Sequence, residues 1–157
     1  MIDNEALWKP HVTVAAVVEH NGKFPLVEEE TASGARFNQP AGHLEPGETL
    51  AEAVVRETLE ETARPFEPAA LVGIYQYYYP VDDVTYLRFA FAGSVGTVDT
   101  SRTLDDGIIR AVWLTSDEIR ANRARHRTPL VVQCMQDYLD GKRYPLGVIA
   151  DGGAFRA

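Results

Sequence analysis

Three glutamates near the middle of the chain, Glu57, Glu60 and Glu61, have a spacing that brings carboxylates together. Residues three and four positions apart lie on the same face of an α-helix, so the three side chains would share one face. Like charges at this spacing repel, and each such pair costs an isolated helix roughly 0.2–0.5 kcal/mol. The cluster therefore requires either open water or a cation between the carboxylates.

A set of carboxylate oxygens without a neighbouring His/Cys set favours Mg²⁺, Mn²⁺ or Ca²⁺ over zinc. We expect Mg²⁺, with Mn²⁺ as a substitute. Such an ion would bridge phosphate oxygens of a substrate and acidify the attacking water. A simpler alternative stays open, a solvated acidic helix face, because Glu is a good helix former and Glu52 can pair with Arg56 at i+4.

The segment that carries these glutamates has the most secure helical pattern of the sequence. Apolar or small residues recur at helical spacing at Ala51, Val54, Val55, Thr58 and Thr62. Thr49 followed by Glu52 predicts a capping box, and Pro65 ends the helix. The loop before the helix has two glycines and a proline, so it can fold back and bring Glu48 to the cluster.

Short segments rich in β-branched and aromatic residues predict the sheet that supports this helix. The predicted strands are residues 11–18, 24–28, 71–79, 85–91 and 110–114. The second is expected to pair back on the first, with Pro25 at an edge or a bulge. Two further helices begin at Thr115 and at Thr128-Pro129. This order predicts an α/β (α+β) fold with helices on both faces of a sheet.

Length and composition limit the remaining classes of protein. The chain has 157 residues, of which 45% are hydrophobic and 24% charged, so we expect a single domain over residues 1–157. A net charge of −8 disfavours binding to nucleic acid or to an anionic membrane surface. Cys134 is the only cysteine, which fits a reducing compartment. Because no apolar segment is long enough to span a membrane, we expect a cytoplasmic protein.

The residues around the three glutamates resemble the Nudix box. That motif reads G-x5-E-x7-R-E-U-x-E-E-x-G-U, where U is a bulky aliphatic residue. The positions that match it at the same spacing are Gly42, Glu48, Arg56, Glu57, Glu60 and Glu61. The sequence departs from the motif at Thr58, Ala63 and Arg64. These three positions concern the packing and the exit turn of the helix rather than its carboxylates.

Resemblance to the Nudix family implies hydrolysis of a phosphoanhydride by attack of water at phosphorus, assisted by a divalent metal. It also implies an α/β/α sandwich around a mixed β-sheet. The implied metal ligands are the carbonyl of Gly42 and the carboxylates of Glu57, Glu60 and Glu61, and one of these glutamates, or an acidic residue elsewhere, would act as the base. Arg56 would orient Glu57 and pair with Glu48, as expected for an arginine among carboxylates.

A closer resemblance covers most of the chain. The segments WKPHVTVAAVV, FNQPAGHLEPGETL, LRFAF and TPLV...GKRYPL are similar to the NudJ-type group of Nudix phosphatases. This implies release of orthophosphate from nucleoside tri- and diphosphates and from hydroxymethylpyrimidine or thiamine pyrophosphate. One alternative is a Nudix pyrophosphohydrolase that cleaves an internal phosphoanhydride, in a nucleoside diphosphate sugar or in a triphosphate that yields pyrophosphate. Another is a non-catalytic Nudix module that binds nucleotide.

Residues outside the box are candidates for contact with a small nucleotide or pyrophosphate substrate. Arg88 lies between apolar residues of a predicted strand, so we expect it to meet either a substrate phosphate or a carboxylate. Tyr77 and Phe37 could stack on a heterocyclic base, although strand packing is the more usual role of such tyrosines. Gln39, close to Phe37, is a further candidate for substrate binding.

Two acidic residues before the last predicted strand leave a question open. Asp105 and Asp106 precede Gly107 and predict a turn, while their membership of the metal site is undecided. The sequence also leaves open the physiological substrate, the number of metal ions, the identity of the base and the oligomeric state.

Overall fold

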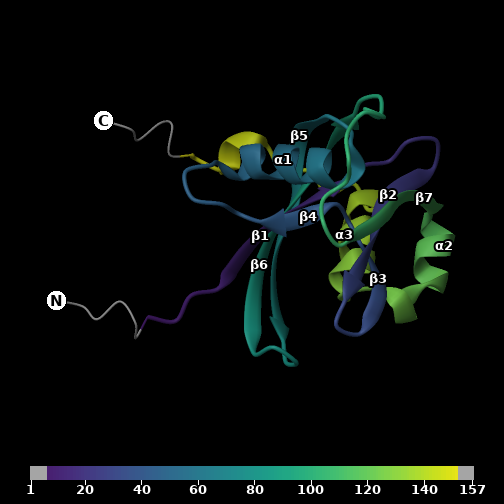
Figure 1. Ribbon diagram of the computed structural model, residues 1–157. Helices are drawn as coiled ribbons and strands as arrows, with labels where there is room; N and C mark the ends of the chain where they lie inside the picture. Colours follow the sequence, from purple (N-terminus) through teal and green to yellow (C-terminus); the bar gives the residue numbers. More distant parts are fainter. Residues whose placement is uncertain (1–6, 152–157) are drawn as a thin grey trace.

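The computed structural model describes residues 7–151, which fold into a mixture of strands and helices (Figure 1). The strands are β1 (His11–Val17), β2 (Lys23–Thr31), β3 (Gly34–Asn38), β4 (Ala41–His43), β5 (Phe66–Tyr79), β6 (Val84–Val95) and β7 (Ile108–Thr115). The α-helices are α1 (Leu50–Thr62), α2 (Ser116–Ala121) and α3 (Leu130–Leu139), and short 3₁₀ turns cover Arg123–Arg125 and Leu146–Val148.

The strands form two sheets. One has the order β4-β1-β6-β5 and is mixed, because β1 and β6 run parallel while the other neighbours are antiparallel. The other has the order β3-β2-β7 and is antiparallel. The predicted pairing of residues 24–28 with the first strand is therefore wrong. Both edges of β1 are taken by β4 and β6, and the chain turns at Asn21 and Gly22, which have positive φ, into the second sheet.

Pro25 lies in the part of β2 that pairs with β7 alone. Pairing with β3 begins at Val27, so the proline sits at a local edge, as predicted, where its missing N–H leaves no gap in the sheet. The sequence prediction omitted β3 and β4. These strands have only five and three residues, and the Pro40 between them hides any alternation of apolar and polar side chains.

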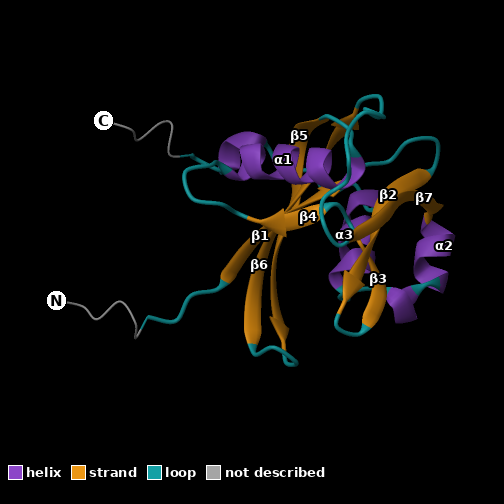
Figure 2. Ribbon diagram, in the orientation of Figure 1, coloured by secondary structure: helices purple, strands orange, loops and turns teal. Residues whose placement is uncertain are grey.

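Helices cover both faces of the mixed sheet, which confirms the predicted sandwich. On one face α1 packs against β1, β5 and β6, and its buried Ala53 and Val54 contact Val14, Phe66 and Phe91. On the other face lies a second core, to which β2, β3, α2 and α3 contribute. Figure 2 shows α1 on one side of the mixed sheet, with α2 and α3 grouped around the three-stranded sheet.

Helix α1 is capped at both ends by hydrogen bonds of the residues that flank it. Thr49 precedes the helix and accepts a hydrogen bond from the backbone N–H of Glu52 at 3.1 Å. At the other end Ala63 has φ 55°, in the left-handed region, and its N–H bonds to the carbonyl of Leu59. This is the position at which the Nudix box has glycine, and left-handed backbone favours glycine.

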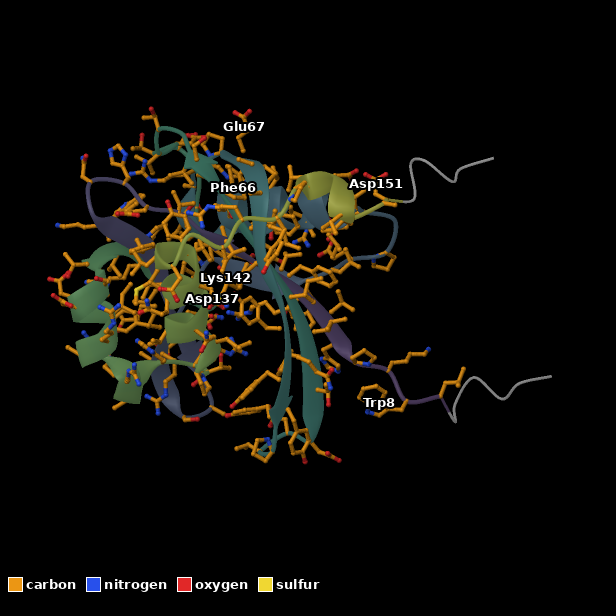
Figure 3. The ribbon with its side chains drawn as sticks, turned by 180° about the vertical axis from the view of Figure 1, so that it is seen from behind. Trp8, Phe66, Glu67, Asp137, Lys142 and Asp151 are labelled. Carbon is orange, nitrogen blue, oxygen red and sulfur yellow. The ribbon has the colours of Figure 1, made fainter. Side chains whose placement is uncertain are left out.

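The remaining predicted elements agree with the structure within a few residues. β5 and β6 form a long hairpin that projects beyond the other strands (Figure 1). Helix α2 begins with the predicted capping box of Thr115 and Glu118. Asp137 of α3 forms an ion pair with Lys142, in which Oδ1 of Asp137 lies 2.9 Å from Nζ of Lys142 (Figure 3). None of the helices formed by residues 7–151 has the length and apolar character of a membrane-spanning segment.

Candidate active site

Helix α1 turns two of the three glutamates inward. Glu57 and Glu61 are only 9% and 6% exposed, whereas the side chain of Glu60 is 32% exposed. Thr58, between them, is fully buried, and its hydroxyl donates to the carbonyl of Val54 at 2.7 Å. A threonine is thus accommodated where the Nudix box has an aliphatic residue, because its polar atom is satisfied within the helix.

Arg56 connects the helix to the loop before it. Its guanidinium donates two hydrogen bonds to Glu48, at 2.7 and 3.0 Å. The other three go to Glu57 at 2.8 Å, Glu60 at 3.2 Å and the carbonyl of His43 at 3.0 Å. These carboxylates raise the pKa of Arg56, and the guanidinium lowers the pKa of Glu48. Arg56 therefore stays charged and holds the loop, the helix and β4 together.

The two buried carboxylates lie directly against β4. A Cβ added to Gly42 would be 2.1 Å from the carboxylate carbon of Glu57, so the backbone can approach this closely only at a glycine. Glu61 accepts a hydrogen bond from the N–H of Ala41 at 3.0 Å. Burial raises the pKa of both glutamates, that of Glu61 to about 9, and the charge of nearby Asp105 adds to the effect.

This donor set fits a divalent cation that prefers oxygen ligands. Within residues 7–151, no three His, Cys, Asp or Glu side chains are gathered into a complete metal cage. Mg²⁺ does not need one, because it usually keeps several waters and binds one or two carboxylates together with substrate phosphates. A cation between Glu57 and Glu61 would favour their charged forms and so offset the cost of burying them.

A cavity of about 610 Å³ opens beside the two carboxylates. This size is within the range usual for small-molecule sites. Gly42, Glu57 and Glu61 line it. The other lining residues include three arginines and several rings: Arg36, Arg88, Arg127, His43, Tyr77, Tyr79 and Tyr86. Glu60 does not line the cavity and is instead held by Arg56.

Arg88 is a buried cation on the wall of this cavity. It is 5% exposed, and its guanidinium donates to the side-chain oxygens of Asn38 and Gln39, each at 3.1 Å. None of the ion pairs formed by the described residues includes Arg88. Its partners are thus the neutral amides of Asn38 and Gln39 and the thiol of Cys134. Arg88 also lines the cavity, where an anion would balance its charge.

The aromatic candidates separate into two groups. Tyr77 lines the cavity, lies opposite Tyr86 in the β5–β6 hairpin, and its ring centre is 6.5 Å from that of Tyr79. Tyr75 belongs to the core, and its hydroxyl donates to Asp137 at 2.8 Å. Phe37 is also a core residue and does not line the cavity; the guanidinium of Arg125 lies 4.4 Å from its ring centre.

Gln39 is likewise separated from the cavity. Its amide nitrogen donates to the carbonyl of Val131 at 2.7 Å while its oxygen accepts from Arg88. Both ends of the amide are therefore bonded within the protein interior. Gln39 orients the guanidinium of Arg88 without itself lining the cavity. The structure therefore does not bring Phe37 and Gln39 to the cavity wall, for which the sequence analysis proposed both.

The acidic pair before β7 forms the predicted turn. The N–H of Asp105 donates to the carbonyl of Glu60 at 2.9 Å, and its carbonyl accepts from Ile108 at 3.1 Å. Gly107 has φ 86°, which completes the turn. The turn is thereby fastened to α1, and this brings the charge of Asp105 close enough to influence Glu57 and Glu61.

Two charged cavity residues have no signal in the sequence. Glu29 belongs to a run of three glutamates at the end of β2, and Arg127 to an arginine-rich segment that reads as a solvated face. In the structure they form an ion pair at 2.8 Å and both line the cavity. No motif or spacing relates residues 98 positions apart in the sequence; only the folding of both segments onto one sheet brings them together.

Buried carboxylates beside a cavity lined by arginines and aromatic rings are suited to bind a phosphate-containing small molecule together with a divalent cation. The sequence profile of the NUDIX domain matches residues 9–133. The chain belongs to the Nudix hydrolase family.

Known relatives agree with this assignment over nearly the whole chain. Phosphatase NudJ of Escherichia coli (strain K12) is 41% identical over 145 residues, which cover 92% of this chain and 94% of the relative. A NUDIX hydrolase from Nitrosomonas europaea superposes with a TM-score of 0.89 at 53% identity, covering 91% of this chain and 97% of the other. The MutT protein of Methanosarcina mazei Go1, at 22% identity, shares the fold with a TM-score of 0.71, covering 88% and 100%.

Proposed function

We propose that this Nudix hydrolase is a Mg²⁺-dependent phosphatase. Its substrates would be nucleoside tri- and diphosphates and hydroxymethylpyrimidine or thiamine pyrophosphate, and its product orthophosphate. The observation that carries the proposal is the presence, in one cavity, of two buried carboxylates and a buried arginine, Arg88, that forms no ion pair with a described residue. The 41% identity to Phosphatase NudJ supports the release of orthophosphate.

The glutamates of α1 have two tasks in this proposal. Glu57, Glu61 and the carbonyl of Gly42 hold the cation from the cavity wall, and Glu60 joins them by exchanging Arg56 for the cation. One of the three carboxylates takes a proton from the attacking water. When bound, Mg²⁺ supplies charge stabilisation to the phosphate oxygens and lowers the pKa of water. Arg56 keeps Glu57 in place and, through Glu48, fixes the loop before the helix.

Other residues of the cavity would bind the substrate. Arg88 binds a phosphate oxygen, because its planar guanidinium is suited to hydrogen bonds with phosphate. Tyr77 offers its ring to the base or pyrimidine, and such stacking contributes roughly 1–3 kcal/mol per base without reading its edge. A substrate held in this way has its terminal phosphate between the arginine and the carboxylates.

Product analysis tests the proposal. The purified protein with Mg²⁺ is incubated with ADP, ATP, thiamine pyrophosphate and a nucleoside diphosphate sugar, and the products are followed by phosphorus NMR. Orthophosphate from the first three, with the sugar nucleotide left intact, is the expected result. Pyrophosphate from ATP, or sugar phosphate, would instead show an internal-bond pyrophosphohydrolase. Binding of ADP without turnover would indicate a non-catalytic module.

A further inference from the structure

Two neighbouring glutamates of β2 form ion pairs with two arginines of one segment. Glu28 and Glu29 are each 8% exposed. Glu28 is bonded by Arg125 and, at 2.6 Å, by Arg110, and does not line the cavity. Glu29 is bonded by Arg127 at 2.8 Å, and both residues of this pair line the cavity. The two pairs are thus alike in chemistry, but only the pair of Glu29 and Arg127 lies at the cavity.

Arg127 is held in position at two points. Its backbone N–H donates to the carbonyl of Phe37 at 2.9 Å, which attaches the segment after α2 to β3. Its guanidinium is fixed by the carboxylate of Glu29. The side chain of Arg127 is nevertheless 46% exposed, so donors of the guanidinium are free to meet a ligand in the cavity.

A continuous series of polar contacts joins Arg127 to Arg88. The amide nitrogen of Asn38 donates to Glu29 at 3.4 Å, and the amide oxygen of Asn38 accepts from Arg88 at 3.1 Å. Glu29 thereby sets the orientation of Asn38, since the nitrogen must face the carboxylate and the oxygen the guanidinium. Glu29 and Asn38 thus link the two arginines into one connected unit.

The charge of this unit favours a terminal phosphate. Two guanidinium groups and one carboxylate give this unit a net charge of +1 in the cavity that Glu57 and Glu61 also line. A terminal phosphate has three non-bridging oxygens and about 1.5 to 2 negative charges at neutral pH, whereas an internal phosphate has only two such oxygens and one charge. Two planar guanidiniums can therefore satisfy more of the acceptors of a terminal group.

We propose that Arg127 is a second phosphate-binding arginine, which together with Arg88 holds the terminal phosphate of the substrate. Glu29 and Asn38 are positioning residues that keep the two guanidiniums in place. The substrate class is then a diphosphate or triphosphate with an unsubstituted terminal phosphate, as opposed to a nucleoside diphosphate sugar. The inference rests on the proposed function, because it assumes that the cavity receives a polyphosphate.

The test compares Arg127→Gln with Arg125→Gln. Both variants remove one arginine of the same segment from an ion pair with a buried glutamate, but only Arg127 lines the cavity. We expect Arg127→Gln to raise the KM for ADP, and the inhibition constant of orthophosphate, by tenfold or more, as for a hydrogen bond to a charged group, worth about 1.5–3 kcal/mol. Arg125→Gln should leave both constants unchanged. Equal constants in the two variants would overturn the proposal.

The positioning role is tested on the adjacent glutamates. Glu29→Gln should raise the KM for ADP several-fold while changing kcat less, and Glu29→Asp should recover part of the affinity. Glu28→Gln weakens the ion pairs of Glu28 with Arg110 and Arg125. It should lower the melting temperature and leave the KM for ADP unchanged. A purely structural role for Glu29 predicts the same behaviour for both glutamine variants, and that result would contradict the assignment.

Failure of the inference is distinguishable from failure of the proposed function. Calorimetric titration of ADP into the protein in EDTA measures phosphate binding without turnover, and it should be weakened in Arg127→Gln but not in Arg125→Gln. If the wild type releases no orthophosphate and this difference persists, the proposed reaction is wrong and the phosphate site stands. If orthophosphate is released and the difference is absent, the reaction stands and the site is wrong.

Discussion

Arg56 donates five hydrogen bonds to groups from three separate segments of the chain. Such a residue restrains each of its neighbours, because its planar guanidinium fixes the direction of every bond. The carboxylates that line the cavity are nevertheless left with free oxygens, since Arg56 binds Glu57 through one oxygen only. At the scale of single residues, the hydrogen bonds of Arg56 therefore restrain Glu57 while leaving one of its carboxylate oxygens free to bind a ligand.

The first prediction concerns Gly42, which lies against Glu57. Gly42→Ala places a Cβ 2.1 Å from the carboxylate carbon, so Glu57 must move and turnover should fall at least tenfold. Gly147→Ala is the control, because a Cβ at Gly147 meets nothing within 4 Å. Steady-state kinetics with Mg²⁺ measure the effect, and normal turnover in Gly42→Ala would show that the position of Glu57 is unimportant.

The second prediction compares glutamates on two faces of α1. Glu61→Gln removes a buried carboxylate from the cavity, and we expect kcat to fall by roughly 10²–10⁴-fold if Glu61 serves as the base. Glu52→Gln alters an exposed position of the same helix and should leave kcat unchanged. Rates are measured with saturating Mg²⁺ and ADP. Full activity of Glu61→Gln would show that Glu61 is neither the base nor a required metal ligand.

At the scale of elements, the end of α1 retains a local strain. Ala63 has the left-handed conformation at φ 55°, which costs an L-residue roughly 1–2 kcal/mol relative to right-handed backbone. We predict that Ala63→Gly raises the free energy of unfolding by about 1 kcal/mol, measured by urea denaturation. Ala51→Gly, inside the helix, should lower it by roughly 0.5–1 kcal/mol. A loss of stability in both variants would contradict the interpretation of the cap.

The attachment of α3 to its surroundings predicts a dependence of stability on pH. Asp137 is buried and accepts hydrogen bonds from Tyr75, Gln133 and Lys142. Burial alone would raise the pKa of Asp137, but these donors, Lys142 first, bring it below its usual value. A lowered pKa stabilises the fold above the pKa of the unfolded state, about 3.9, and this contribution is lost as the pH falls through the lower folded value.

The corresponding experiment uses Asp137→Asn. Urea unfolding is followed at neutral pH and at a series of values below about pH 4, where an unfolded Asp takes up its proton. The wild type should lose more stability than the variant over this acidic range, and the two should run parallel at neutral pH. Parallel curves through the whole range would show that Asp137 does not carry this contribution.

At the scale of the whole molecule, the fold and the metal site are separable. Two hydrophobic cores lie on either side of the mixed sheet, and neither depends on a cation. We predict that EDTA abolishes turnover and leaves the circular dichroism spectrum unchanged. Mg²⁺ at a hundred times its Kd should stabilise the folded state by about 2.7 kcal/mol. This stabilisation should disappear in Glu57→Gln, and its persistence there would place the cation elsewhere.

From the sequence alone, the helix with its three glutamates and most of the strands could be predicted. These properties are local, because helix capping and the periodicity of apolar residues depend on neighbours within a few positions. The family resemblance follows from the same short stretch, from Gly42 to Glu61. That the whole chain of 157 residues forms one domain stays a prediction.

Only the tertiary structure decided which residues share the cavity. It separates β1 from β2 into different sheets, moves Phe37 into the core and turns Gln39 behind Arg88. It also unites Glu29 with Arg127. Such partners are chosen by the packing of two sheets against shared helices, and packing joins segments that are far apart in the chain. A pattern confined to neighbouring residues contains no information about that choice.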